Sequence, residues 1–298
     1  GAEKLLGKGD MLYDPVGNSK PMRIQGTFID EKDVARLVDY CCSQAAPSFS
    51  ENAVKAAVEG EKPGAAKNED LDDLFMLGGS SGGARPKILT TVDDEDWIIK
   101  FPSSVDPHNI GEEEYKLALL AKRCGITFPE VRLFKSKRCS GYFGVKRFDR
   151  LIDKGLHKKV HMVSAGALLE TSHRIPNLEY ENLFKLTSLL QCPANSIEQL
   201  YRLMCFNVFI GNRDDHAKNF SYVYHKESGW ELSPAYDLTI NSGIYGEHAT
   251  TVNGKGKNIA LEDLVVVGVE AGIAHTKARV LAEEIQDIIQ QTGKLAEF

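Results

Sequence analysis

The stretch Gly211-Asn-Arg-Asp-Asp-His-Ala-Lys-Asn-Phe220 places an aspartate, Asp214, five positions before an asparagine, Asn219. Another acid, Asp237, follows soon afterwards. Phosphoryl transfer needs such a set, because one carboxylate accepts or orients the proton of the attacking hydroxyl, while an amide oxygen and a second carboxylate bind magnesium. The alternative is a solvated polar turn that caps a helix, since short motifs also occur by chance. The rest of the chain has to distinguish these two interpretations.

The spacing of Asp214 and Asn219 is that of the protein-kinase catalytic loop, H-R-D-x-x-x-x-N. Asn212 and Arg213 precede Asp214, so the usual His-Arg pair is missing. The sequence therefore predicts a kinase-like active site that differs from the ordinary eukaryotic type.

A glycine-rich segment, residues 78–87, precedes two predicted strands at Ile88–Val92 and Trp97–Lys100. Glycines let backbone N–H groups approach phosphate oxygens, and basic side chains add charge. A flexible Gly/Ser loop is the alternative. The second strand ends in lysine, as does the V-A-I-K strand whose lysine neutralises the α- and β-phosphates of ATP. The expected nucleotide contacts here are Gly82, Gly83, Lys87 and Lys100.

A helix is predicted from about Gly111 to Cys124, with a stop at Gly125. Its first turn is acidic, which suits the helix dipole in itself. The functional interpretation is that Glu114 pairs with Lys100, as the αC glutamate of kinases does.

Further strands are predicted at Val131–Phe134 and Tyr142–Phe148, leading to a hinge between lobes. From about residue 160 onward the pattern predicts mainly helices. One buried helix ends at Gly211. A hairpin follows it, and a closing helix has its core face at Leu281, Ile285, Ile288 and Ile289.

The N-terminal residues predict a strand at Asp10–Tyr13, a second strand at Met22–Gly26 and a helix after the N-cap candidate Asp30. The segments Lys4–Tyr13 and Arg23–Phe28 resemble the end of the motor domain in FtsK/SpoIIIE-type DNA translocases. The sequence holds no G-x-x-x-x-G-K-[ST] phosphate loop, which excludes a working motor. We interpret residues 1–45 as a fused remnant or an accessory surface, followed by a polar linker over residues 46–70.

Read together, the glycine-rich loop, the strand lysine, D-x-x-x-x-N and the later aspartate resemble the HipA-type toxin kinases of bacteria. The resemblance covers about residues 72–292. It is carried by Gly78–Lys87, Trp97–Pro102, Val145–Arg150, His161–Leu169, Phe206–Phe220, Leu232–Leu238 and Val252–Asn258.

The resemblance implies an α+β, two-lobed protein-kinase-like fold, with a β-rich N-lobe over residues 71–150 and a mainly helical C-lobe over residues 151–298. It implies an autophosphorylating serine/threonine protein kinase that uses ATP and Mg²⁺. Asp214 is then the catalytic base, with Lys218 able to stabilise the transferring phosphate, and Asn219 and Asp237 are the metal ligands. The remaining implied positions are the nucleotide-binding residues Arg147, Phe148 and His216, and the autophosphorylation sites Ser80 or Ser81.

In the longer members of that family an extra N-terminal subdomain helps to dock a DNA-binding antitoxin, and here the translocase-like segment stands in its place. The implied protein substrate is of the class of translation factors or aminoacyl-tRNA synthetases. Two alternatives to a protein kinase stay open. One is a small-molecule phosphotransferase of the aminoglycoside or choline kinase sort, and the other is a non-catalytic kinase-fold module that binds a partner.

Composition agrees with a globular protein of 298 residues and a net charge of -6, which argues against a protein that mainly coats nucleic acid. The six cysteines form no C-x-x-C pair, so reduced thiols are expected rather than a zinc site or a disulfide framework. No apolar run approaches the length of a membrane span, and no signal peptide is visible. We therefore expect a cytoplasmic location and no membrane partner. The chain begins at Gly1 rather than methionine, as a fragment or a processed form would.

Overall fold

The computed structural model describes residues 10–13, 22–25, 71–72, 85–153, 156–171, 178–241, 243 and 245–294. The chain divides into two compact units, Gly1–Lys62 and Pro63–Phe298. In the first unit β1 (Asp10–Tyr13) pairs antiparallel with β2 (Met22–Gln25), as the alternating apolar residues predict. The helix expected after Asp30 and the linker expected over residues 46–70 lie outside the described residues.

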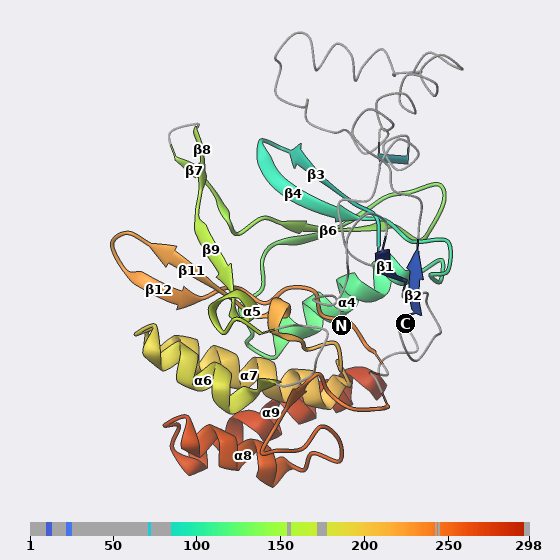
Figure 1. Cartoon of the computed structure of the whole chain (residues 1–298). Coiled ribbons are helices and arrows are strands. Elements are labelled where there is room, and N and C mark those ends of the chain that lie inside the picture. Colours follow the sequence, from blue (N-terminus) through green and yellow to red (C-terminus); the bar gives the residue numbers. More distant parts are fainter. Residues whose placement is uncertain are drawn as a thin grey trace, which may run out of the picture. The chain divides into compact units, whose positions relative to one another are not determined.

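In the second unit, the first lobe is built on a four-stranded antiparallel sheet in the order β3-β4-β6-β5 (Figure 1). A two-residue turn, Asp93-Asp94, joins its first two strands, and both aspartates have positive φ, as type I′ hairpins require. Trp97 and Ile99 alternate along β4 and are fully buried. The strands are β3 (Lys87–Val92), β4 (Glu95–Lys100), β5 (Val131–Phe134) and β6 (Tyr142–Lys146).

One helix, α4 (Ile110–Arg123), packs against β5 and β6 of this sheet. Ala118 and Ala121 lie on its buried face. The same face carries Glu114, which is 5% exposed. A buried carboxylate is costly unless it is paired, so this residue needs cationic partners.

The second lobe contains α6 (Tyr180–Leu189), α7 (Ala194–Ile210), α8 (Leu261–Glu270) and α9 (His275–Lys294), which stack below the sheet in Figure 1. The middle of α7 is buried at Leu200, Tyr201, Met204 and Phe206, which share the largest hydrophobic core with residues from all four helices. The helix ends at Gly211 with φ of 73°, in the left-handed conformation that favours glycine. This end delivers the chain into the D-x-x-x-x-N loop.

The expectation that the chain becomes helical from about residue 160 is wrong for its first part. Residues 161–164 form β9, which pairs with β11 in a three-stranded sheet of order β12-β11-β9. The pairing joins residues about sixty positions apart, so no local periodicity reports it. The elements of this region are β7 (Arg150–Asp153), β8 (Leu156–Lys159), β9 (His161–Ser164), α5 (Ala165–Leu168), β10 (Leu178–Glu179), η2 (Ala217–Asn219), β11 (Ser221–His225), β12 (Gly229–Leu232) and β13 (Thr250–Thr251).

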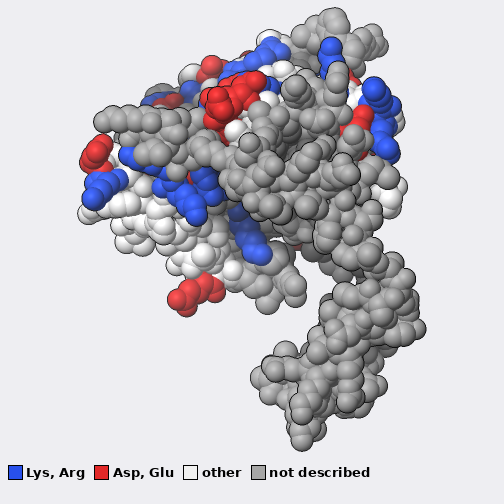
Figure 2. Space-filling view, turned by 90° about the horizontal axis from the view of Figure 1, so that it is seen from above, with Lys and Arg blue, Asp and Glu red and all other residues white. Residues whose placement is uncertain are grey.

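The predicted α+β class with a β-rich first lobe and a mainly helical second lobe is confirmed. Basic and acidic side chains are interspersed over the described part of the face shown in Figure 2. Among the helices that the structure describes, none is both long and apolar enough to cross a membrane.

Candidate active site

Lys100, at the end of β4, connects the two lobes. Its ammonium group donates a hydrogen bond to Oδ1 of Asp237 at 2.6 Å and a second one to Glu114 of α4. Burial lowers the pKa of Lys100, but the two carboxylates together raise it by a larger amount. The net pKa therefore lies above the ordinary 10.5. Lys100 is therefore a permanent cation held between an acid of each lobe. The pairing of Lys100 with Glu114 is the one expected from the sequence.

Glu114 is held by a second cation that the sequence did not single out. Nη1 of Arg85 lies 3.3 Å from Oε2 of Glu114, and Nε of the same guanidinium lies 3.3 Å from Oδ2 of Asp106. Asp106 is itself fixed by the backbone N–H and the hydroxyl of Ser103, at 2.8 and 2.7 Å. The end of the glycine-rich segment is thus tied to the same carboxylate that holds Lys100.

Asp237 follows β12 and has a φ of +55°, a conformation that is uncommon for a residue other than glycine. The backbone N–H of Ala235, two residues earlier, donates to the carbonyl of Thr127 in the first lobe at 2.8 Å. Burial raises the pKa of Asp237, but Lys100, Lys87 and His216 together lower it by more, with Lys100 contributing most, so the net pKa lies below 3.8. The carboxylate is ionised and aimed at a group of cations.

Lys87 is the second cation of this group. It lies directly opposite Lys100 in the β3–β4 register, so the two lysines share one face at one end of the sheet. Two adjacent cations beside an ionised carboxylate suit a ligand with several negative charges that also carries a metal ion. The structure brings these predicted residues together, although they come from distant parts of the sequence.

The D-x-x-x-x-N loop brings Asp214 and Asn219 into contact. The Asn219 Nδ2 atom donates to the backbone carbonyl of Asp214 at 2.7 Å, which fixes the amide group and turns its oxygen away from that carbonyl. The Asp214 side chain is 49% exposed, and its Oδ1 atom lies 3.8 Å from Nε2 of His216. Lys218 is exposed, and its carbonyl accepts a hydrogen bond from Tyr236 at 2.6 Å. An accessible carboxylate on a fixed backbone is what a base acting on a hydroxyl requires.

The neighbouring acid, Asp215, has the opposite environment, since its side chain is fully buried. It accepts hydrogen bonds from the Tyr180 hydroxyl, His248 Nδ1 and the backbone N–H groups of Ala249 and Thr250. No role was predicted for Asp215 from the sequence. The only local hint was the pair of adjacent aspartates, Asp214-Asp215, because the hydrogen-bond partners of Asp215 lie more than thirty positions away in the sequence.

At the hinge between the lobes, the Arg147 guanidinium forms two hydrogen bonds to Asp149, at 2.9 and 2.7 Å. The Phe148 ring lies 5.8 Å from the ring of Tyr236, beside Asp237. The nucleotide contacts assigned to Arg147 and Phe148 stay predictions. Gly82, Gly83, Ser80 and Ser81 lie outside the described residues.

Magnesium prefers oxygen ligands and is usually held by one or two carboxylates together with substrate phosphates. Asn219 and Asp237 offer an amide oxygen and an ionised carboxylate of this kind, so the donor set fits. Within the described ranges, no group of three or more His, Cys, Asp or Glu residues could hold a metal ion by itself. These residues therefore suit a metal that arrives with a phosphate ligand.

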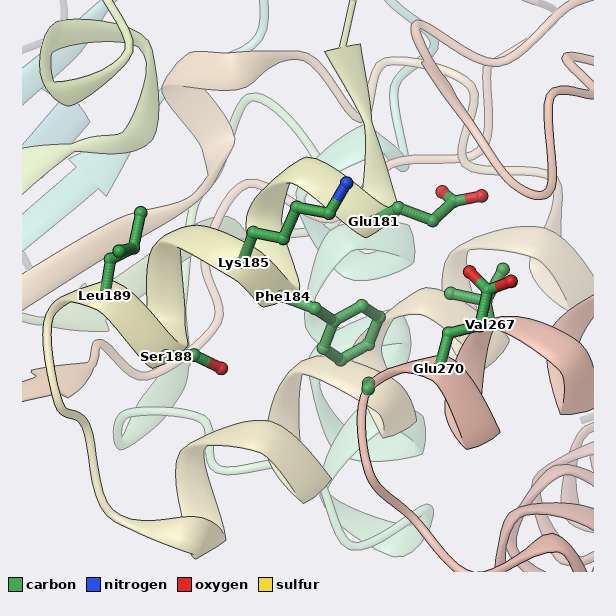
Figure 3. Close-up of a pocket in the computed structure, with 8 residues that line it drawn as sticks. Glu181, Phe184, Lys185, Ser188, Leu189, Val267 and Glu270 are labelled. Carbon is green, nitrogen blue, oxygen red and sulfur yellow. The ribbon is translucent and has the colours of Figure 1, made fainter.

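A separate groove of about 520 Å³ lies between α6 and α8 (Figure 3). Phe184 and Val267 form part of its apolar lining, with Glu181 and Glu270 near them. None of the candidate catalytic residues lines this groove, so it is distinct from the site on the catalytic loop.

Residues 79–295 match the family described as "HipA-like C-terminal domain". The chain belongs to this family. The match covers both lobes and all the described site residues, from Arg85 to Asp237.

A solved relative of the same fold is HipA of Shewanella oneidensis, in a complex with HipB and operator DNA. Its TM-score is 0.59 at 19% identity, over 86% of this chain and 76% of that chain. A sequence relative, the putative kinase Y4dM of Sinorhizobium fredii, is 29% identical over 169 residues, which are 53% of this chain and 40% of that protein.

The short resemblance to DNA translocases is also confirmed. FtsK of Oceanobacillus iheyensis is 44% identical over 75 residues, which are 25% of this chain but 9% of the translocase. The chain thus spans less than half the length of each of these two sequence relatives.

Proposed function

We propose that this HipA-like chain is an ATP- and magnesium-dependent kinase that phosphorylates serine or threonine residues of proteins. The observation that supports the proposal most directly is the pairing of Lys100 with both Glu114 and Asp237. Protein kinases require the strand lysine to pair with a helix glutamate and a metal-binding aspartate to be in place. In this chain, one ammonium group joins both acids.

The roles of the residues follow from their positions. Lys100 and Lys87 face the phosphates of ATP, and Asn219 with Asp237 would hold magnesium, which neutralises phosphate charge when it is bound. Asp214 takes the proton of the acceptor hydroxyl as that oxygen bonds to the γ-phosphorus and ADP leaves. Lys218 stabilises the charge on the transferring group.

A protein acceptor is favoured over a small molecule by the serine-bearing glycine loop and the segment Ser233-Pro-Ala-Tyr-Asp237. A DNA-binding partner protein is a further part of the proposal. It is supported by the solved Shewanella complex, in which a HipA relative is bound to HipB and operator DNA. Docking of such a partner would differ from that in the longer family members, because the translocase-like residues stand in place of their N-terminal subdomain.

The test is to incubate the purified chain with γ-labelled ATP and Mg²⁺, together with a generic protein acceptor, and to map labelled residues by mass spectrometry. Label on serine or threonine is the expected result. Asp214→Asn should lose most of the transfer while it still binds ATP, because an amide cannot take the proton. Wild-type transfer confined to choline or an aminoglycoside would contradict the protein-kinase assignment, and a folded Asp214→Asn variant with normal turnover would contradict the role of Asp214.

A further inference from the structure

We propose that Asp215 is a positioning residue, which holds the catalytic loop so that the adjacent Asp214 keeps its place. This inference rests on the proposed function, because the loop it holds carries the proposed base. Asp215 itself has no exposed side-chain surface, so it is not a group that meets the substrate.

The two neighbouring carboxylates have opposite environments, and this contrast is the first observation. The Asp214 side chain is 49% exposed, whereas that of Asp215 is 0% exposed. An isolated buried carboxylate is strongly disfavoured, so Asp215 has to be compensated by donors that surround it.

The donors are the second observation. Oδ2 accepts from the Tyr180 hydroxyl at 3.0 Å and lies 3.1 Å from His248 Nδ1, while Oδ1 accepts from the N–H groups of Ala249 at 2.9 Å and Thr250 at 3.2 Å. The Thr250 hydroxyl also donates to the backbone carbonyl of Asp215. Both the side chain and the backbone of Asp215 are therefore fixed by the segment 248–250.

A third set of contacts extends this network to α7. The Tyr180 hydroxyl accepts a hydrogen bond from Asn207 Nδ2 at 3.0 Å, and the Asn207 Oδ1 atom accepts one from Asn212 Nδ2 at 3.0 Å. Asn212 opens the catalytic loop, so the network begins and ends on the loop. The Tyr180 hydroxyl accepts from Asn207 and donates its own proton to Asp215.

The role is distinct from general support of the lobe. Asp214 is covalently joined to Asp215, and its carbonyl is the acceptor for Asn219. A shift of the Asp215 backbone would therefore move the proposed base, Asp214, directly. A displacement of about 1 Å can cost about 100-fold in rate.

The main variant is Asp215→Asn, which keeps the shape and one acceptor oxygen for the backbone N–H groups. Its amide would face the Tyr180 hydroxyl, leaving that proton without its acceptor. We expect kcat to fall by about 10- to 100-fold while KM for ATP changes by less than about threefold. Amide hydrogen exchange of residues 212–216 in the nucleotide-free protein should become faster, and this readout does not depend on activity.

Tyr180→Phe is the milder variant, and it serves if Asp215→Asn does not fold. It removes one donor to Asp215 and should lower kcat severalfold with little change in KM. The matched control is Thr187→Val on the same helix α6. The Thr187 hydroxyl is buried and bonds to Leu183 and Tyr222, so its loss lowers stability without touching the loop.

Loss of kcat and faster loop exchange in the Asp215 or Tyr180 variant, with neither change in Thr187→Val, is the expected result. A folded Asp215→Asn or Tyr180→Phe variant with wild-type kcat and wild-type exchange would overturn the inference. A wild-type protein without phosphoryl transfer would instead overturn the proposed function. In that case faster loop exchange in the variants would still support Asp215 as the residue that holds the loop, and unchanged exchange would refute it.

Discussion

The ammonium nitrogen of Lys100 lies 2.6 Å from Oδ1 of Asp237, although the two residues are 137 positions apart in the sequence. The same nitrogen also bonds to Glu114, so the two lobes meet at one cation. Asp237 is also a proposed magnesium ligand. The Lys100–Asp237 contact therefore links the arrangement of the two lobes to the protonation state of Asp237 and to magnesium binding there.

Replacement of Lys100 by Met should raise the pKa of Asp237. Lys100 is the largest cause that lowers the pKa of Asp237. Without its charge, the effect of burial, which raises this pKa, is no longer offset. A lowered carboxylate pKa contributes stability that is present above the ordinary value of 3.8 and is lost as the pH falls through the lowered one. The variant should lose this contribution at neutral pH, and its phosphoryl transfer should fall by about 100-fold or more.

The measurement is an NMR titration of the ¹³C-labelled Asp237 carboxyl in wild type and Lys100→Met. The conservative Lys100→Arg keeps the charge and should keep the low pKa. An Asp237 titration that is identical in wild type and Lys100→Met would show that another cation controls this carboxylate.

Magnesium should bind weakly to the nucleotide-free protein and much more tightly with ATP. The Asp237 carboxylate already pairs with Lys100, and Asn219 adds one amide oxygen. Phosphate oxygens are therefore needed to complete the octahedral coordination of Mg²⁺. Calorimetric titration with MgCl₂, with and without a non-hydrolysable ATP analogue, measures the difference. Tight Mg²⁺ binding without nucleotide would contradict the proposed arrangement, and Asp237→Asn should weaken the nucleotide-dependent binding.

Local signals in the sequence predicted most of the elements, and the similarity to kinase motifs predicted the Lys100–Glu114 pair. Turn residues delimit β3, β4 and β5, and Gly211 ends α7 because the residue after the helix adopts a left-handed φ. The contact of Lys100 with Asp237 was not predicted, because Asp237 was expected only as a magnesium ligand.

The residues that escaped prediction are those whose roles depend on distant contacts. Strand β9 is stabilised by pairing with β11, and Asp215 acquires its role from Tyr180 and His248, which come from other segments. The pairing of Arg85 with two carboxylates, Asp106 and Glu114, was likewise not predicted. Periodicity and propensity report a residue's own segment, and none of these contacts lies within one segment.

Arg85 should prove necessary for ATP affinity, because it is the second cation on Glu114. Arg85→Gln should raise KM for ATP by about tenfold, which corresponds to the loss of one charge-assisted hydrogen bond. Arg85→Lys should restore little of it, since a lysine cannot reach two carboxylates with a planar fork. The control is Arg279→Gln, which breaks the ion pair between Arg279 of α9 and Glu262 of α8. Equal KM values for Arg85→Gln and this control would refute the role of Arg85.

Asp263 should contribute to stability in a pH-dependent way. It is buried at the start of α8, where it accepts hydrogen bonds from Lys255, Asn253 and the N–H of Ala260. Burial raises the pKa of Asp263, but these donors together lower it by a larger amount, so the net pKa lies below 3.8. Its contribution is therefore present at neutral pH and is lost as the pH falls through the lowered pKa.

Asp263→Asn should lower the free energy of unfolding by about 1–3 kcal/mol at neutral pH. The difference from wild type should narrow as the pH falls from about 5 through 3.8 to the lowered native pKa, because over this range the unfolded chain binds a proton that the native carboxylate still excludes. Denaturant unfolding at a series of pH values measures it, with the exposed Asp287→Asn as the control. A constant difference across that pH range would mean that the charge of Asp263 is not what stabilises α8.

Autophosphorylation of the glycine-rich loop, most readily on Ser80, should switch the kinase off. Ser80 and Ser81 stand among glycines whose proposed task is close contact with the phosphates of ATP. A phosphate there adds about -1.5 to -2 charges and repels the nucleotide. It also competes for Arg85, which now holds Glu114 at 3.3 Å, and loss of that contact would loosen the carboxylate that positions Lys100.

The comparison that decides this is between Ser80→Ala and Ser80→Asp, with Ser81→Ala as the matched control for the second hydroxyl. Calorimetry should show ATP bound normally by Ser80→Ala and more weakly by Ser80→Asp, since the added negative charge faces the phosphates. After incubation with ATP and Mg²⁺, mass spectrometry should find phosphate on the loop of wild type and of Ser81→Ala but not of Ser80→Ala. The switch is refuted by equal ATP affinity in Ser80→Ala and Ser80→Asp, or by a loop that carries no phosphate while a separate acceptor protein becomes labelled.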